Sequence, residues 1–553
     1  MTIVQRRIGG LFGLFFLLLV IAGGRTLYLA ALKGGSLRKA AATQQLTAEV
    51  VPAQRGAITD RNGIDLAVSE PAQDISATPY LIKEPLAAAQ KLAPLLGVPQ
   101  AQLLRKLSER SGFVYLKRAL PAKQAHAVMA LKLAGVAGAP VMRRVYPRGD
   151  LAAQVLGVVG TEGNGLSGLE YSRNALLHGQ AGERHVVSDA LGQPVSIAET
   201  HPEISGTSVS LTLDANIQQR TEDVLGAVGK VFSPKDATAI VMDPRSGAIL
   251  AMANWPQVNA NDPSASSPED LANRAVSFDY EPGSTFKAVT VAGALQQGLV
   301  KPTSSFYIPD QIQVADRTIH DDTEHGDETL TTAQILAQSS NVGAIKIGAL
   351  EGAKDFSSWV TKFGFGKRSG IELPGEEIGQ VLPVSHYSGS SMGNLPIGQG
   401  QLVTPLQMAS AYSAIANGGV LRPPHIISSV GGESQATPQG HRVISSQTAA
   451  SLREMLEGVL APGGTASEVS IPGYRLAGKT GTASKVDEAT GEYSKSRYVA
   501  SFMGFAPASN PKLLCAVIVD EPQSGSIFGG TVAAPAFGQI MSFALPYLRI
   551  PPG

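Results

Sequence analysis

An uncharged apolar segment near the amino terminus places the strongest limit on how this chain folds. No Asp, Glu, Lys or Arg occurs between Arg7 and Arg25. At about 1.5 Å per residue, a helix over this segment covers nearly the whole hydrocarbon core of a bilayer. Apolar residues continue through Leu32 if the Arg25 side chain reaches back to the interface. We therefore predict a transmembrane anchor over residues 8–32.

The charges before the anchor indicate its orientation. Arg6 and Arg7 precede it, so residues 1–7 are expected to stay in the cytoplasm and the rest to be exported. The alternative is a cleaved signal peptide. Ala40-Ala41-Ala42 has suitable residues for cleavage, but it lies well beyond the apolar stretch, where such sites normally follow closely. An uncleaved, single-pass anchor is favoured, and no later segment resembles a second span.

Length, charge and cysteine content bound what the exported part can be. With 553 residues, the chain is expected to form two or more folded units. Its formal net charge of +0 argues against a nucleic-acid partner, which needs a basic surface. The single cysteine, Cys515, excludes an internal disulfide and a thiolate metal cluster. It lies in an apolar run that reads as a buried strand.

Periodicity and turn residues predict an α+β fold with a domain boundary near residue 205. The expected elements are a hairpin around the Asn62-Gly63 turn, amphipathic helices over 85–135, short strands over 143–197, a strand over 209–213, a helix from the Asp214 cap to Leu225, a hairpin around the turn 244–247 and a last hairpin near 499–519. We predict domains over 33–205 and 206–553, the first smaller and strand-rich, the second a sheet with helices packed on both faces.

Three short motifs occur in order in the second domain. They are Ser284-Thr285-Phe286-Lys287, Ser339-Ser340-Asn341 and Lys479-Thr480-Gly481-Thr482. Each alone is weak, because Ser36-Leu37-Arg38-Lys39 also fits the first and Ser172-Arg173-Asn174 the second. Both of these alternatives lie ahead of any good third motif.

The context of Ser284 favours a nucleophile. Pro282-Gly283 ends an extended run, and a helical stretch from Ala288 to Gln297 follows, so Ser284 and Lys287 share one face of a helix start. A serine hydroxyl needs a neighbouring base, and a buried lysine can be neutral enough to serve. Backbone N–H groups at a helix start also stabilise an oxyanion. Taken alone, a capping serine beside a surface lysine is the commoner outcome for such a pair.

The other two motifs supply groups that complete such a site. Ser339 can relay a proton to a leaving group, and Asn341 can hold Lys287 and a substrate amide. The third motif reads as a strand whose glycines let another backbone approach, so a peptide can add as an extra strand with its carboxylate facing Lys479 and Thr480. A bulged edge strand is the alternative reading.

With these motifs in place, the chain resembles a class B penicillin-binding protein, and more closely the division-type peptidoglycan transpeptidases. The likeness covers nearly the whole chain beyond the anchor. It includes Arg55-Gly56 with Asp60-Arg61-Asn62-Gly63, residues 165–170 with 182–184, residues 280–284, 339–343, 398–400 and 404–407, and 479–483.

The resemblance implies a peptidoglycan D,D-transpeptidase with a transpeptidase fold. Ser284 is acylated by the penultimate D-Ala of a D-Ala-D-Ala stem peptide with Lys287 as base, and Thr482 shares the oxyanion hole with Ser284. Gly481 lies in the substrate-binding strand, an amine of a neighbouring stem accepts the acyl group, and β-lactams bind covalently. No cofactor or metal is implied.

The resemblance also implies a location and partners. Residues 33–205 resemble the family's pedestal, or dimerisation-type, domain, which contacts division or elongation membrane proteins. The polymerase is expected to be a separate multi-spanning glycosyltransferase. The protein is placed in the bacterial cytoplasmic membrane with its catalytic domain outside, and division is favoured over elongation.

Three other motifs are discounted. Residues 163–168 match a dinucleotide fingerprint, but no suitable helix is expected at the third glycine. Residues 389–393 match a hydrolase elbow, but Pro396 follows too soon for its helix. The segment 320–325, with two His, two Asp and one Glu, is read as a solvated loop before a helix at Thr332 rather than a metal site.

Two other classes of function remain open. A carboxypeptidase or β-lactamase would pass the acyl group to water. A penicillin-responsive receptor, or a scaffold with a vestigial serine, would not turn over a substrate. A receptor needs a signalling domain across the membrane, but only seven residues precede the anchor. A vestigial site would be expected to lack one of the three motifs, and none is missing.

Overall fold

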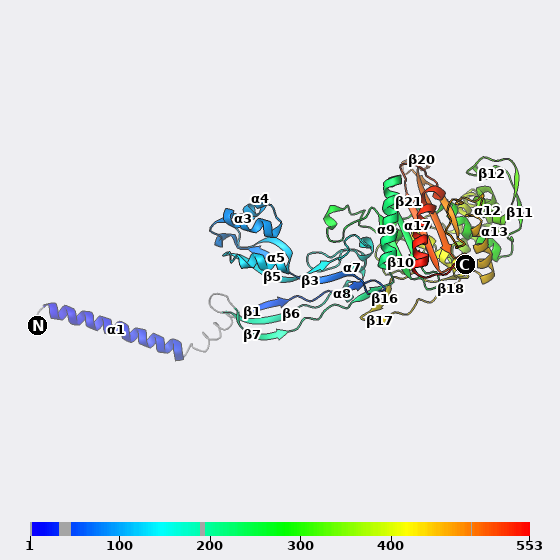
Figure 1. The fold of residues 1–553 in the computed structure, drawn as a ribbon. Helices are drawn as coiled ribbons and strands as arrows, with labels where there is room; N and C mark the ends of the chain where they lie inside the picture. Colours follow the sequence, from blue (N-terminus) through cyan, green and yellow to red (C-terminus); the bar gives the residue numbers. More distant parts are fainter. Residues whose placement is uncertain (1–2, 32–45, 189–193, 488, 553) are drawn as a thin grey trace. The chain divides into compact units, whose positions relative to one another are not determined.

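A computed structural model describes the chain apart from residues 1–2, 32–45, 189–193, 488 and 553 (Figure 1). The chain divides into two compact units. One comprises Met1–Gln54, Pro71–Met142 and Gly179–Gly206, and the other Arg55–Glu70, Arg143–His178 and Thr207–Gly553. The predicted domain bounds of 33–205 and 206–553 stay a prediction.

The first unit begins with the predicted apolar helix. Helix α1 runs over Ile3–Ala31, and its part from Arg6 to Ala31 is long and apolar enough to cross a membrane. The alternative first motif at 36–39 and the cleavage site considered at 40–42 lie outside the described residues.

The rest of the first unit is a small mixed fold. Its elements are strands β1 (Leu46–Val51), β4 (Val114–Pro121), β5 (Val136–Val145), β6 (Gly182–Ser188) and β7 (Pro194–His201), the 3-10 turn η1 (Pro79–Leu81), and helices α3 (Pro85–Leu96), α4 (Gln100–Leu107) and α5 (Ala122–Ala130). The helices bury Leu92, Leu103 and Val128 in one apolar cluster with Leu116 of β4. The amphipathic helices expected over 85–135 are confirmed, although β4 interrupts them.

The second unit starts with the predicted hairpin. Strand β2 (Ile58–Thr59) pairs antiparallel with the start of β3 (Asp65–Ala77) across the Asn62-Gly63 turn. On its other side β2 pairs parallel with β8 (Val209–Leu211), which in turn pairs with β16 (Ile427–Val430).

Part of the region expected to form short strands is helical instead. Helices α6 (Ala153–Leu156), α7 (Gly168–Ser172) and α8 (Asn174–Leu177) occupy it. The strand prediction is wrong there because long-range contacts fix these turns. The buried carboxylate of Glu170 in α7 accepts Arg55 Nε at 2.5 Å and Arg144 Nε at 2.6 Å. Helix α7 also opens at the third glycine of the discounted dinucleotide match, where no helix was expected, yet no βαβ unit surrounds it.

A five-stranded antiparallel sheet forms the centre of the second unit. Its order is β10 (Ile249–Trp255), β9 (Asp236–Met242), β21 (Leu513–Asp520), β20 (Tyr493–Ala506) and β19 (Ala477–Val486). The hairpins predicted at 244–247 and 499–519 are both confirmed. Every residue of β9 and β21 is buried, as a strand covered on both faces requires.

Helices cover both faces of this sheet, as predicted (Figure 1). On one face, α9 (Ala215–Phe232) and α17 (Gly529–Tyr547) bury Val224 and Phe537 against Val241 and Phe502. The Asp214 carboxylate caps α9 by accepting from Asn216 N and Ile217 N, and the helix runs seven residues beyond the predicted end. On the other face lie α11 (Lys287–Gln296), α15 (Pro405–Ala416) and α16 (Ser446–Glu457), which share a larger core with Ile240 and Met503.

The remaining elements of the second unit complete that face and its surroundings. They are η2 (Pro263–Ala265), α10 (Arg274–Ser277), η3 (Gly283–Phe286), α11 (Lys287–Gln296), β11 (Ser305–Ile308), β12 (Gln311–Val314), β13 (Arg317–His320), β14 (Glu328–Thr331), α12 (Thr332–Gln338), α13 (Asn341–Lys362), η4 (Val384–His386), α14 (Ser391–Asn394), η5 (Leu395–Ile397), α15 (Pro405–Ala416), β15 (Val420–Leu421), β17 (Glu433–Ser434), β18 (His441–Arg442) and α16 (Ser446–Glu457).

Candidate active site

Ser284 lies in the first turn of the helical segment that η3 and α11 form together. The 3-10 turn η3 contains it and runs directly into α11, which begins at Lys287. The preceding Gly283 has φ 53°, a conformation that glycine adopts without strain, and its N–H donates to the Gly398 carbonyl at 3.1 Å. A Cβ on Gly398 would lie 2.2 Å from the Gly283 carbonyl oxygen. The turn that contains the predicted nucleophile, called the nucleophile turn below, is therefore held against the 398–400 loop at backbone contact distance.

Lys287 joins the first motif to the second. Its ammonium is fully buried, and its Nζ donates to the Ser339 carbonyl at 2.5 Å and to Asn341 Oδ1 at 2.6 Å, with Ser339 Oγ at 3.3 Å. Burial lowers the pKa of Lys287 to about 8, and the carboxylates of Asp322 and Asp321 act against that shift. The neutral form of this side chain is therefore far more accessible at physiological pH than that of an ordinary lysine.

The second motif spans the junction between two helices. Ser339 ends α12 with φ 66°, Ser340 caps α13 by accepting from Gly343 N at 2.9 Å, and Asn341 is the first residue of α13. This tight reversal points both the carbonyl and the hydroxyl of Ser339 toward Lys287. Sequence reasoning placed the motif in one helical segment, whereas the structure uses the break between two.

Two aspartates of the discounted 320–325 segment support this junction. Asp321 accepts Ser340 Oγ at 2.8 Å and Val342 N at 3.0 Å, and it also accepts Asn341 N. Asp322 Oδ1 accepts Asn341 Nδ2 at 3.1 Å, which orients the amide oxygen of Asn341 toward Lys287. The segment does precede a helix at Thr332, but its Asp321 side chain is only 8% exposed. In the sequence, the available signal was a run of acidic residues shortly before the second motif. The spacing of these residues did not show that Asp321 and Asp322 would contact that motif.

The third motif lies on β19, the end strand of the sheet. In the described part of the chain, β19 pairs with β20 alone, with Lys479 opposite Met503 and Gly481 opposite Ser501. Lys479 is fully buried, and burial together with the nearby charge of Lys287 holds its pKa well below the usual range. Its Nζ lies 3.2 Å from the Thr480 carbonyl oxygen.

Gly481 brings the third motif against the nucleophile turn. A Cβ at this position would lie 2.4 Å from Ser501 Oγ and 2.9 Å from Thr285 Cγ2. Only a residue without a side chain lets β19 pass this close to η3. The three motifs, separated by up to about two hundred positions in the chain, are therefore brought together at one place.

Neighbouring groups fix the threonines of β19. Thr480 Oγ1 lies 2.7 Å from Thr465 Oγ1, and Thr482 Oγ1 accepts from Gly529 N at 3.1 Å. Gly529 is the first residue of α17, so the last helix of the chain contacts the strand that carries the third motif. Sequence reasoning missed both Thr465 and Gly529.

The discounted residues have other contacts. Ser172 Oγ donates to the Glu372 carbonyl at 2.6 Å, and Asn174 Oδ1 accepts Arg55 Nη1 at 2.7 Å, so the alternative second motif lies in a structural network.

Cys515 is buried in β21, as predicted, and burial raises the pKa of its thiol. Within the residues described, no group of three or more His, Cys, Asp and Glu is placed to hold a metal ion.

Comparison with known proteins identifies the family. Residues 237–542 match the penicillin binding protein transpeptidase domain, and residues 50–211 match the penicillin-binding protein dimerisation domain. The chain belongs to the class B penicillin-binding proteins. The transpeptidase match contains all three motifs, which confirms the resemblance noted from the sequence.

Relatives of this penicillin-binding protein are similar over nearly their full length. PbpB of Mycobacterium tuberculosis is 35% identical, over 97% of this chain and 84% of the relative. The peptidoglycan D,D-transpeptidase FtsI of Escherichia coli is 32% identical, over 99% of this chain and 93% of the relative. Among solved structures, penicillin-binding protein 3 of Mycobacterium tuberculosis in complex with aztreonam gives a TM-score of 0.72 at 31% identity, covering 91% of this chain and 98% of that one.

Proposed function

We propose that this penicillin-binding protein is a division-type peptidoglycan D,D-transpeptidase that cross-links stem peptides through an acyl-enzyme on Ser284. The observation that carries the proposal is the buried Lys287, whose hydrogen bonds tie the nucleophile helix to the second motif. Relatives named as peptidoglycan D,D-transpeptidases support the substrate class.

Lys287 acts as the base in this scheme. A neutral amine has two hydrogens and one lone pair. The two short hydrogen bonds, to the Ser339 carbonyl and to Asn341 Oδ1, use two hydrogens and leave the lone pair free to take the Ser284 proton. The same two acceptors then stabilise the ammonium that forms.

The acylation step follows from these positions. Ser284 Oγ attacks the carbonyl of the penultimate D-Ala, and the N–H groups of Ser284 and Thr482 receive the oxyanion. The bond to the terminal D-Ala nitrogen breaks, and Ser339 Oγ passes a proton to that nitrogen from Lys287. An amine of a neighbouring stem then attacks the ester, which releases Ser284 and forms the cross-link.

The end strand β19 binds the donor peptide. Its free edge accepts an added strand, and the glycine at 481 leaves room beside the nucleophile turn. Lys479, Thr480 and Thr482 face the terminal carboxylate of the donor. A β-lactam, which carries an anionic group next to a reactive amide, enters the same way; the solved relative bound to aztreonam supports this.

The amino-terminal helix anchors the enzyme in the bacterial cytoplasmic membrane. Residues 1–7 stay inside, and the catalytic unit works outside, where peptidoglycan is assembled. A multi-spanning glycosyltransferase and other division membrane proteins are its expected partners, because the two matched domains are a transpeptidase and a dimerisation domain.

Intact mass spectrometry tests the proposal. The full chain in a non-ionic detergent is treated with benzylpenicillin and followed over hours, beside Ser284→Ala and, as a matched control, Ser172→Ala. We expect one long-lived adduct that is lost only in Ser284→Ala. No adduct on the unmodified chain would favour the scaffold reading, and rapid drug turnover without an adduct would favour a hydrolase.

A further inference from the structure

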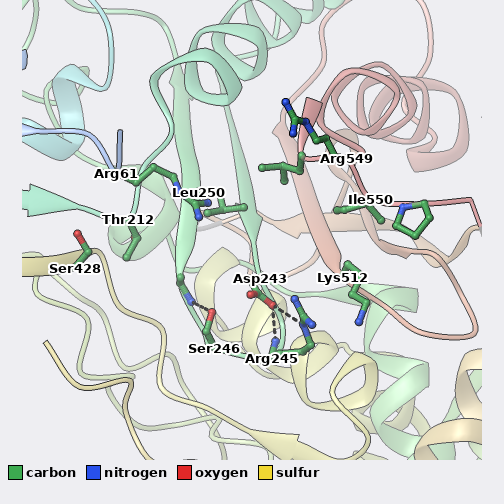
Figure 2. Close-up of a pocket in the computed structure, with 13 residues that line it drawn as sticks. Arg61, Thr212, Asp243, Arg245, Ser246, Leu250, Ser428, Lys512, Arg549 and Ile550 are labelled. Carbon is green, nitrogen blue, oxygen red and sulfur yellow. Dashed lines mark hydrogen bonds and ion pairs between the residues drawn. The ribbon is translucent and has the colours of Figure 1, made fainter. Parts of the chain in front are cut away.

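A cavity of about 540 Å³ on the second unit lies outside the active-site residues described above (Figure 2). Six separate parts of the chain line it, and four of them carry a cation: the turn after β2, the β9–β10 turn, the residue before β21 and the carboxyl-terminal segment. These cations are, respectively, Arg61, Arg245, Lys512 and Arg549. None of the residues that line it belongs to the three motifs.

The cavity has an excess of positive charge. Asp243 is its one acidic lining residue, and its Oδ1 accepts Arg245 N at 2.9 Å and Arg245 Nε at 3.4 Å. Among the described residues, no salt bridge is formed by the side chains of Arg61, Lys512 or Arg549. The whole chain has zero net charge, so this excess is local. Gathered cations without an anion repel one another, and a bound anion relieves that repulsion.

The backbone that carries these cations is well fixed. Arg549 has φ 53° and its N–H donates to the Pro546 carbonyl, while the next carbonyl, of Ile550, accepts Tyr474 OH at 2.6 Å. In the β9–β10 turn, a Cβ on Gly247 would lie 2.5 Å from the Pro423 carbonyl oxygen. Arg61 follows Asp60, whose carboxylate accepts Asn62 N at 2.7 Å. Because the backbone that carries these cations is already fixed, binding of a ligand does not have to order it.

The apolar lining limits what the anion can be. Leu548 and Ile550, which are both half-buried, also line the cavity, and Figure 2 labels Ile550. A chain of phosphates would satisfy the cations and leave these side chains facing water. A peptide with carboxylates on either side of an apolar side chain satisfies both, because guanidinium groups bind carboxylates in bidentate geometry.

The geometry points to this cavity as a binding site for an acidic peptide segment of a partner protein, with at least two carboxylates flanking an apolar residue. The site is independent of the transpeptidase reaction and needs no motif residue. Arg61 and Lys512 hold the two carboxylates, and Leu548 and Ile550 receive the apolar side chain.

A binding titration tests the proposal. The full chain in non-ionic detergent is titrated against a fluorescent peptide with the sequence Gly-Glu-Glu-Leu-Glu-Glu-Gly, and fluorescence anisotropy is measured. We expect saturable binding that weakens about tenfold or more when Arg61→Gln and Lys512→Gln are combined. The matched control Lys230→Gln with Lys301→Gln, two exposed lysines outside the cavity, should bind like the unmodified chain. A peptide with Gly in place of Leu should bind more weakly.

Other outcomes overturn the proposal. Equal weakening in both double variants would mean non-specific attraction. Tight binding of inorganic polyphosphate or of soluble peptidoglycan fragments at this cavity, with no peptide binding, would assign the site to another anion. Penicillin acylation of Ser284 should be unchanged in both double variants, which shows that each remains folded and separates this test from that of the transpeptidase reaction.

Discussion

Asp321 accepts a hydrogen bond from the Ser340 hydroxyl at 2.8 Å, and so a loop residue holds the start of helix α13 in place. The same carboxylate accepts Val342 N at 3.0 Å. Because Ser340 lies between Ser339 and Asn341, the position of both groups around Lys287 depends on this contact. The second motif is thus supported from outside its own helices.

Removal of the Asp321 carboxylate should destabilise this junction. Asp321→Ala leaves the donors of Ser340, Asn341 and Val342 without their acceptor, which should cost about 2 kcal/mol of unfolding free energy. The exposed Asp327→Ala loses one surface hydrogen bond, to Tyr307, and should cost less than about 0.5 kcal/mol. Thermal unfolding of the two variants beside the unmodified chain measures the difference; equal shifts would refute the supporting role.

Acylation should depend on pH through Lys287. The pKa of Lys287 is lowered to about 8, so the neutral amine that serves as base becomes more abundant as pH rises through that value. We expect the second-order rate of labelling by a fluorescent penicillin to rise from pH 6 to about 9 and then level off. Lys287→Gln should label far more slowly and without this rise. A rate that falls over the same range would contradict the assignment of Lys287 as base.

Asp322 should set the position of that pH profile. Its negative charge raises the pKa of Lys287 against the effect of burial. Asp322→Asn keeps the shape and an acceptor for Asn341 but removes the charge, so the pKa of Lys287 should fall and the rise in labelling rate should move to lower pH. The exposed Asp316→Asn serves as a control with an unchanged midpoint. A midpoint that stays fixed in Asp322→Asn would rule out this electrostatic effect.

Gly481→Ala should disturb the site far more than its size suggests. The added Cβ would lie 2.4 Å from Ser501 Oγ and 2.9 Å from Thr285 Cγ2, so β19 must move away from the nucleophile turn. We expect a loss of about 1–3 kcal/mol in stability and at least a tenfold slower penicillin acylation. Gly226→Ala, on α9 with its nearest contact at 4.0 Å, should instead be neutral or stabilising. Similar acylation rates for the two variants would mean that the close approach is not needed.

Cys515 should be chemically silent in the folded protein. It is fully buried in β21, and burial raises the pKa of its thiol. Iodoacetamide should leave the native chain unmodified over hours and alkylate it in denaturant, as intact mass shows. Cys515→Ala should still form the penicillin adduct. Fast alkylation of the native chain would show that β21 opens locally.

The main features of the catalytic unit could be predicted because their signals are local. The Asp214 cap and the turn at 244–247 each act within a few residues. The support that Asp321 and Thr465 give to the motifs could not be predicted from the sequence, because both residues reach the motifs through tertiary contacts. Helix α17 was missed for another reason: it begins with two glycines and contains Pro535 and Pro546, which are helix-breaking signals on any local scale. Burial of its apolar face outweighs them.

The strand order of the central sheet has a consequence for synthesis. Strand β9, the first of the sheet to leave the ribosome, pairs on one side with β21, the last. Until residue 520 has been translated, β9 and β10 form an isolated apolar hairpin with an exposed edge, which favours aggregation. A chain truncated before β21 would therefore contain all three motifs and still fail to assemble them. Protection of this hairpin until the chain is nearly complete therefore becomes a condition for making an active enzyme.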